Sequence, residues 1–204
     1  MITNGFDDRG AEEVKLQKGF VLSHIGSLLS GRNPENLWQV LGELISEDKN
    51  FKKEFRLELT GAVSDDLLAS IKKAGLEEHL QHRKYVSHNE ALRLQKEATV
   101  LLLIEINSEI TKGIIAGKLF EYLAANRPIL AIGPQDWDVD KILNETGAGQ
   151  VFLYSDTLVL KEQVLKYFTK YQSGELTSSA ENIEQYSRKN LTKKLANLIK
   201  QEWE

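Results

Sequence analysis

Short runs of apolar residues alternate along this chain with longer segments in which apolar residues recur every three or four positions. Short continuous runs are typical of buried strands, and the longer spacing is typical of amphipathic helices. The chain holds about six such strand-then-helix repeats and no longer internal repeat. This rhythm predicts a Rossmann-like, doubly wound α/β domain built on a mostly parallel sheet of about six strands.

The expected strands are short and are separated by helices or turn residues. They span residues 20–26, 55–61, 80–86, 99–104, 129–133 and 150–154. The segment 80–86 has the weakest apolar signal. The segment 99–104 is apolar almost throughout, as expected of a central parallel strand that helices cover on both faces.

The expected helices carry recognisable start and stop signals. They start at residues 35 and 64, cover residues 88–97, 117–126 and 139–145, and include a stretch around 164–168. Ser87, with Glu90 three residues later, forms a capping box. Gly75 is expected to end one helix. Pro128 ends another, because proline disfavours helical geometry at the residue before it.

A last helix is expected in the tail after residue 180. Its apolar residues fall on one helical stripe, which consists of Leu191, Leu195, Leu198 and Ile199. Such a stripe needs a surface to pack against, and residues 201–204 after it read as exposed. No Gly/Ser linker divides the chain. We therefore expect a lead-in at residues 1–18, one Rossmann-like domain at 19–178, and a C-terminal helix at 179–204.

Composition narrows the class of protein. The 204 residues are 41% hydrophobic, enough for a buried core, and the net charge of -4 offers no broad basic surface to a nucleic acid. The absence of Cys excludes disulfides and thiolate metal sites and favours a cytoplasmic location. Apolar runs are far shorter than the roughly 20 residues that span a bilayer, and residues 1–10 lack a secretory pattern. Peripheral contact with a membrane stays open.

The loop after the first strand is a candidate phosphate site. In open parallel sheets, ligands bind outside the carboxyl ends of the strands. Residues 26–34 begin with Gly26 and Ser27, contain one Arg, Arg32, and lead into a helix. Small residues let the backbone approach a ligand, helix N–H groups attract anions, and a guanidinium binds phosphate through two N–H groups. The alternative is an ordinary turn with a surface Arg.

The loop after the fourth strand has the same character. Its small and apolar residues are expected to cradle a diphosphate, through Gly113, Ile114, Ile115, Ala116 and Gly117. Glu121 falls one helical turn beyond Gly117, where a carboxylate can accept hydrogen bonds from ribose hydroxyls. In the alternative, Glu121 is a solvated charge on the helix face that pairs with Lys118 three residues earlier.

Several familiar signatures are missing. The chain has no G-x-G-x-x-G and no P-loop, which argues against dinucleotide oxidoreductases and P-loop kinases, and it has no G-x-S-x-G elbow. Its four His residues show no metal-ligand spacing, so we expect no protein-bound metal. His24 is expected to be a core or strand-end residue. His88 either caps a helix or faces a ligand.

Segments spread over nearly the full length match one family. Residues 2–7, Ile-Thr-Asn-Gly-Phe-Asp, are similar to the Asn-Gly-Val-Asp segment that joins the two domains of the family 4 retaining glycosyltransferases, enzymes of GT-B fold. Residues 24–32 are similar to that family's glycine-bounded first loop. Residues 121–125 are similar to the helix that carries the second glutamate of its E-x7-E motif. The chain therefore resembles the C-terminal, donor-binding domain of these enzymes.

The resemblance implies roles for the matched positions. Arg32 takes the place of the phosphate-binding Lys, and Glu121 takes that of the ribose-binding glutamate. Gly61 matches the glycine after the second strand, and Tyr85 and Val86 match a Gly-Tyr-Val segment whose backbone contacts the base. Residues 186–188 resemble the tail that crosses back onto the N-terminal domain, which would explain the unpaired apolar stripe.

The chain departs from the family pattern at three positions. Gly113 stands where the family has the first glutamate of E-x7-E, Ser27 where it has an Arg, and Lys84 where it has a Gly. A subgroup of the family with Gly-Lys-Leu-Phe-Glu-Tyr-Leu-Ala in this loop departs in the same way. We interpret the changes as subgroup variation.

We predict a domain that binds a UDP- or GDP-linked sugar, needs no cofactor, and presents the sugar to an acceptor held by an N-terminal domain that this chain lacks. Arg32 and Lys118 are expected to stabilise charge on the leaving diphosphate. The other expected ligand-binding residues are Gly26, Ser27, Tyr85, Val86, His88, Gly113, Ile114, Ile115, Ala116, Gly117 and Glu121. The complete enzyme would serve polysaccharide or glycan synthesis, at the inner face of the membrane or in the cytoplasm. Two alternatives are a sugar-nucleotide epimerase of similar fold and a non-catalytic flavodoxin-like interaction domain.

Overall fold

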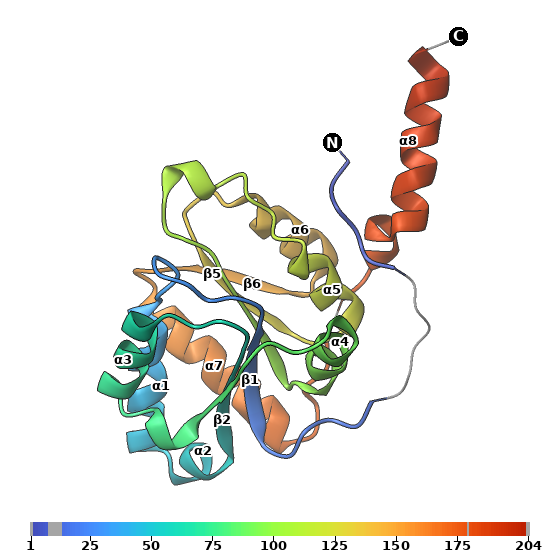
Figure 1. Ribbon diagram of the computed structural model, residues 1–204. Coiled ribbons are helices and arrows are strands. Elements are labelled where there is room, and N and C mark those ends of the chain that lie inside the picture. Colours follow the sequence, from blue (N-terminus) through green and yellow to red (C-terminus); the bar gives the residue numbers. More distant parts are fainter. Residues whose placement is uncertain (1, 8–13, 179, 203–204) are drawn as a thin grey trace.

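A parallel sheet of six strands lies at the centre of the structure, a computed structural model that describes residues 2–7, 14–178 and 180–202 (Figure 1). The strands are β1 (Phe20–Ile25), β2 (Phe55–Thr60), β3 (Leu80–Arg83), β4 (Val100–Ile104), β5 (Ile129–Gly133) and β6 (Gly149–Leu153). Their order across the sheet is β3-β2-β1-β4-β5-β6, and every neighbouring pair is parallel. The chain therefore reverses its direction of winding between β1 and β4, the place where such sheets bind ligands.

Helices cover both faces of the sheet. One layer holds α1 (Glu35–Glu47), α2 (Lys49–Glu54), α3 (Asp65–Lys73) and α7 (Thr157–Gln172). The other holds α4 (His88–Glu97), α5 (Lys118–Ala125) and α6 (Asp138–Thr146). Three short 3-10 helices, η1 (Glu77–His79), η2 (Glu109–Thr111) and η3 (Ile183–Tyr186), lie in the connections, and α8 (Arg188–Glu202) ends the described chain.

The continuous apolar strand β4 shows why two helical layers are needed. Successive side chains of a strand point to opposite faces. Leu102 and Ile104 pack into the layer of α1 and α7, whereas Leu101 and Leu103 pack into the layer of α5 and α6. All five residues of β4 are buried. The prediction of a central strand covered on both faces is confirmed.

Two local predictions need correction, and one helix was not predicted. The third strand ends at Arg83, so Tyr85 and Val86 lie in the loop that follows it. The helix α2 was not expected, because Phe51 is the only buried residue of its polar sequence and leaves no periodic signal. The capping box is half formed. The Ser87 hydroxyl accepts from the N–H of Glu90, but the Glu90 carboxylate pairs with an Arg one turn later instead of returning to Ser87.

The two ends of the described chain lie side by side. The N–H of Phe6 donates to the carbonyl of Tyr186 (3.1 Å), and the N–H of Arg188 donates to the carbonyl of Phe6 (2.9 Å). The rings of Tyr186 and Phe120 pack at 5.6 Å, which attaches this pair of segments to α5. The N-terminal segment and α8 extend from the same side of the molecule (Figure 1).

The helix α8 projects away from the sheet (Figure 1). Leu191, near its start, is buried, whereas Leu195 and Leu198 further along are 47% and 46% exposed. The predicted apolar stripe is thus present and mostly uncovered. Of the predicted lead-in and tail, residues 1, 8–13, 179, 203 and 204 lie outside the described residues. Within the described part of the chain, no helix combines the length and the apolar character needed to cross a membrane.

Candidate functional site

The loops after β1 and β4 meet at the carboxyl edge of the sheet. Gly26 follows β1 with a φ of +121°, in the left-handed region that favours glycine. A Cβ atom at Gly26 would lie 2.6 Å from the Nζ atom of Lys118, the first residue of α5. The absence of a side chain at Gly26 therefore lets Lys118 cross the end of β1 and brings the two candidate loops together.

Arg32 is held by a carboxylate that directly follows β4. Both the Nε atom (3.1 Å) and a terminal nitrogen (2.8 Å) of Arg32 contact the Oε1 atom of Glu105. The same oxygen accepts from the N–H of Ile106 at 2.8 Å. The Glu105 side chain is 3% exposed and that of Arg32 is 31% exposed. One edge of the guanidinium is thus fixed to the protein, and the rest of the group reaches the surface.

Lys118 is held by a buried histidine. The Nδ1 atom of His24 lies 2.9 Å from the carbonyl oxygen of Leu102, and its Nε2 atom lies 3.2 Å from Nζ of Lys118. A carbonyl oxygen only accepts, so Nδ1 carries the proton and Nε2 accepts from the ammonium group. Burial, and then the positive charge of Lys118, lower the pKa of His24 well below its ordinary value. His24 is therefore neutral at physiological pH, and its expected place at a buried strand end is confirmed.

Lys118 lies between Arg32 of the first loop and the carboxylates of Glu105 and Glu121. Burial and the neighbouring charge of Arg32 lower the pKa of Lys118 to about 8, while Glu105 and Glu121 act in the opposite direction. The ammonium group thus lies within electrostatic reach of all three side chains. Arg32 follows β1 and Glu121 follows β4, so both residues lie toward the carboxyl edge of the sheet.

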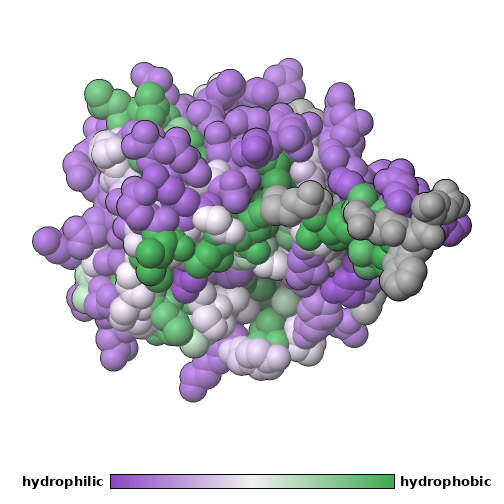
Figure 2. All heavy atoms as spheres, turned by 90° about the horizontal axis from the view of Figure 1, so that it is seen from above, coloured by the Kyte–Doolittle hydropathy of each residue, from purple (hydrophilic) through white to green (hydrophobic). Residues whose placement is uncertain are grey.

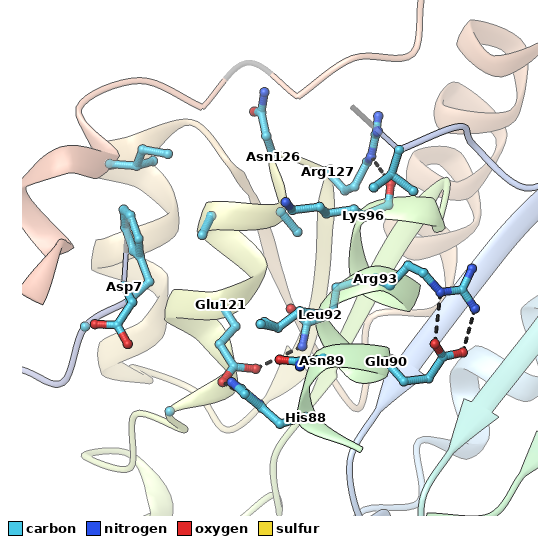
Figure 3. Close-up of a pocket in the computed structure, with 18 of the residues that line it drawn as sticks. Asp7, His88, Asn89, Glu90, Leu92, Arg93, Lys96, Glu121, Asn126 and Arg127 are labelled. Atoms are coloured by element: carbon cyan, nitrogen blue, oxygen red, sulfur yellow. Dashed lines mark hydrogen bonds and ion pairs between the residues drawn. The ribbon is translucent and has the colours of Figure 1, made fainter. Parts of the chain in front are cut away.

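Glu121 faces a groove between α4 and α5. Its Oε2 atom accepts from Nε2 of Gln95 at 2.9 Å, and its Oε1 atom lies 4.0 Å from Nδ1 of His88. Figure 3 shows the side chains of Glu121 and His88 directed toward one another across the end of the groove. Gly117 also lines the groove, and Lys96 and Arg127 lie at the end away from Glu121 (Figure 3). The Glu121 side chain is 33% exposed, so a carboxylate oxygen is accessible to a ligand.

The remainder of the β4–α5 loop is fastened to α6. The indole N–H of Trp137 donates to the carbonyl of Ile114 (2.7 Å), and the N–H of Asp138 donates to the carbonyl of Lys112 (2.9 Å). Gly113 is exposed and open to solvent. The three residues that follow Ile114 form the approach to the N-terminus of α5, with Ile115 and Ala116 partly buried and Gly117 exposed.

Three further candidate residues, Ser27, Tyr85 and Val86, differ in how exposed they are. Ser27, directly after Gly26, is exposed at the same edge. Tyr85 is 90% exposed, whereas Val86 is partly buried against the layer of α4 and α5. The structure gives Tyr85 and Val86 a common loop that leads to His88, and this loop borders the groove.

Sequence reasoning missed Glu105 and Tyr154. The hydroxyl of Tyr154, just after β6, donates to the carbonyl of Glu105 at 2.9 Å. A signal for Glu105 was present, because a carboxylate directly follows a buried apolar strand at the edge where ligands bind. Its partner could not be read, since Arg32 lies 73 positions away in the sequence. Across the described residues, no group of three or more His, Asp or Glu side chains is arranged to hold a metal ion.

No protein-family model and no curated protein sequence matches the chain. Several solved structures match the chain in fold. A mutant of TarM from S. aureus, solved with fondaparinux, α-GlcNAc-glycerol and UDP, is similar with a TM-score of 0.68 and 14% identity over 97% of this chain and 38% of that chain. WaaG, a glycosyltransferase involved in lipopolysaccharide biosynthesis, has a TM-score of 0.64 and 17% identity over 90% of this chain and 47% of that one. HepE from Anabaena, in complex with UDP, has a TM-score of 0.64 and 11% identity over 90% and 49%.

These likenesses establish the fold. The six-stranded parallel sheet with its flanking helices and terminal helix is the GT-B arrangement that the neighbouring structures share. The chain spans less than half the length of each of these three chains.

Proposed function

From a fold shared with GT-B glycosyltransferases, we propose that this chain is the donor-binding half of such an enzyme and binds a nucleoside-diphosphate sugar. The observation that carries the proposal is that the loops after β1 and β4 meet at the carboxyl edge of the sheet, where Lys118 crosses the end of β1 within electrostatic range of Arg32 and Glu121. Two cations suit a diphosphate and one accessible carboxylate suits a ribose. In the complete enzyme the sugar passes to an acceptor with retention of configuration.

In this proposal the diphosphate lies between Arg32 and Lys118, before the N-terminus of α5. Arg32 offers the N–H groups that Glu105 leaves free, Lys118 offers a point charge, and the N–H groups near Ala116 and Gly117 add the positive end of the helix dipole. Each charge-assisted hydrogen bond contributes about 1.5–3 kcal/mol. These groups stabilise the charge that builds on the leaving diphosphate and so lower the free energy of the transition state.

The nucleoside half of the ligand is assigned to the other side of Lys118. Glu121 accepts from the ribose hydroxyls, and Gln95 and His88 hold its carboxylate in place. The loop of Tyr85 and Val86 borders the base. Because TarM and HepE were solved with UDP, UDP is the first ligand to test and GDP the second.

The partner of this half is an acceptor-binding domain placed against α8. The matched region covers only 38% to 49% of each of the neighbouring chains. Seen from the side toward which α8 extends, apolar side chains form a band between hydrophilic surroundings (Figure 2). Leu195, Leu198 and Ile199 on α8 are about half exposed. An apolar face of this kind is buried when a second domain covers it.

Calorimetry with UDP and GDP tests the assignment. Replacing Arg32 by Ala should weaken nucleoside-diphosphate binding about tenfold or more, because a charge-assisted hydrogen bond is lost. Arg56 is the matched control, since it is an exposed Arg near the amino end of β2, at the opposite edge of the sheet. The Arg56→Ala variant should bind UDP like the wild type. Equal affinities of wild type and Arg32→Ala would contradict the diphosphate site.

Two further measurements address the chemistry. Chelation by EDTA should leave nucleotide binding unchanged, because the proposed site neutralises the diphosphate with side chains. The isolated chain should bind a UDP-sugar without converting it, because the acceptor site lies on the other domain. Formation of an epimerised sugar nucleotide would instead support the epimerase.

A further inference from the structure

We propose that Glu105 is a positioning residue for the diphosphate site: it holds one edge of the Arg32 guanidinium so that the opposite edge is presented to the ligand. This inference rests on the proposed function and extends it to a side chain that does not itself contact the ligand. Glu105 and a diphosphate are both negatively charged, so the effect of Glu105 on binding has a definite sign that an experiment can measure.

Glu105 is fixed by three neighbouring strands. It follows β4, its N–H donates to the carbonyl of Ile132 on β5 (2.9 Å), and its own carbonyl accepts from the hydroxyl of Tyr154 after β6. Its carboxylate is tied down by the N–H of Ile106. A residue this constrained, with a side chain that is 3% exposed, offers the guanidinium a rigid point of attachment.

The contacts use only part of what Arg32 can donate. A guanidinium carries five N–H groups in a planar fork. Two of its nitrogens, Nε and one terminal nitrogen, engage the same oxygen of Glu105. The other terminal nitrogen and the second hydrogen of the engaged one stay directed away from the carboxylate. Since Arg binds phosphate best through two parallel N–H groups, holding one edge leaves a preformed fork on the other.

Preorganisation has a measurable value here. A free Arg side chain has rotamer entropy, part of which is lost when a ligand fixes it. The pairing with Glu105 removes that freedom before the ligand arrives. The opposing effect is the negative charge of Glu105, which repels a diphosphate. A carboxylate that merely neutralised Arg32 would weaken binding, and its removal would then raise the affinity.

The test compares the Glu105→Gln variant with the wild type by calorimetry, with UDP and with uridine. Loss of the charged anchor should weaken UDP binding about threefold to tenfold and leave uridine binding unchanged, because uridine lacks the diphosphate. In the double variant with Arg32→Ala, UDP should bind no more weakly than to Arg32→Ala alone, since Glu105 acts through Arg32. A purely structural residue would not show this dependence.

Two variants control for charge and folding. Glu109 lies in the same loop, pairs with Lys112 and has an 85% exposed side chain. Glu109→Gln removes the same charge and should leave UDP affinity unchanged. The Arg32→Lys variant keeps Glu105 intact, so it serves if Glu105→Gln does not fold. A Lys ammonium group is a single point charge, so it cannot pair with Glu105 and also offer two parallel N–H groups to a phosphate. This variant should therefore bind UDP nearly as weakly as Arg32→Ala.

The outcomes separate the two proposals. An unchanged or higher UDP affinity in Glu105→Gln, or additive losses in the double variant, would overturn the positioning role and leave the diphosphate site standing. If Glu105→Gln does not fold, wild-type affinity in Arg32→Lys overturns the role in the same way. A wild-type chain that binds neither UDP nor GDP would overturn both proposals.

Discussion

The interior of the sheet and its carboxyl edge are built from the same strands, but the interior holds apolar side chains and the edge holds charged ones. Inside, β4 and β5 are buried along their whole length and their side chains alternate between two apolar layers. One residue further, where β4 ends, the carboxylate of Glu105 lies beside Arg32, and Lys118 crosses the end of β1. The contrast indicates that stability comes from the length of the strands, and it assigns the proposed anion recognition to the residues where the strands stop.

The edge differs from the interior because its polar groups are tied to the backbone. The carbonyl of Leu102 fixes His24, which in turn accepts from Lys118. The N–H of Ile106 fixes Glu105, which holds Arg32. Burying charged groups costs free energy that pairing of this kind repays only in part. We therefore expect the edge to lower the stability of the fold, and we expect the same groups to raise its affinity for an anion.

The largest effect is expected in the interior. Phe51 has no exposed surface and packs on Phe55 at 4.9 Å and on Phe168 at 5.0 Å. Replacing Phe51 by Ala should lower the free energy of unfolding by about 3–5 kcal/mol, as expected for a large aromatic residue in a core. Urea titration measures the change. Leu158→Ala, at a side chain that is 77% exposed, is the control and should change little. A small loss in Phe51→Ala would mean that the interior is not the source of stability.

A stabilising effect is expected at the edge. The pKa of Lys118 is lowered to about 8 in the folded chain, from an ordinary value of 10.5. Below pH 8 Lys118 is charged in both states, but burial and the charge of Arg32 destabilise the ammonium group only in the folded state. Lys118→Met should raise the free energy of unfolding by about 1–3 kcal/mol at pH 7, measured by urea titration. It should also weaken UDP binding.

The pH dependence of that gain provides its control. Between pH 8 and 10.5 the unfolded state binds the proton that the folded state has lost, so the stability of the wild type rises relative to Lys118→Met. The advantage of the variant should therefore shrink across this window. An advantage that stays constant with pH would point to packing instead of charge.

A smaller effect is expected on the affinity for UDP. The diphosphate favours the charged form of Lys118, so affinity should be highest below pH 8 and fall severalfold as the pH rises through the pKa of about 8. The charge of the ligand is constant in this range, since phosphate monoesters lose their second proton near pH 6. Calorimetry at pH 7 and pH 9 measures the ratio. In Lys118→Met the ratio should be close to one, and an equal decline in both proteins would assign the pH effect to another group.

The smallest effect is expected in α8, which belongs to neither region. Leu198 is 46% exposed, so Leu198→Glu should change the free energy of unfolding by less than about 0.5 kcal/mol. Leu191, which is buried near the start of the same helix, is the matched comparison. Leu191→Glu should cost clearly more in the same urea titration. Equal losses at the two positions would show that the stripe is already covered within this chain.

The sequence allowed most of the fold to be predicted because strands and helices differ in period. The sixfold strand-and-helix rhythm and the strand 129–133 were predicted with the boundaries observed or close to them. The helix α2 was not predicted, because six residues with one buried side chain show no helical periodicity of apolar positions. The third strand was predicted too long, because the apolar Val86 that extended it packs in the following loop.

Only those residues of the candidate site that lie in local sequence motifs could be predicted. Gly26, Arg32 and Lys118 could be found because glycines and cations next to helix starts are visible in a linear sequence. Their partners, Glu105 and His24, are brought to them by the order of strands in the sheet, since β1 and β4 are neighbours in space and far apart along the chain. The roles of these residues toward a ligand stay predictions.

The hydrogen-bonded contact between Phe6 and the start of α8 has a mechanical consequence. The polypeptide enters and leaves the sheet-bearing body at one place, through two adjacent segments. A module whose entry and exit coincide can be inserted into a longer polypeptide at a small loop-closure entropy, because its ends are already together.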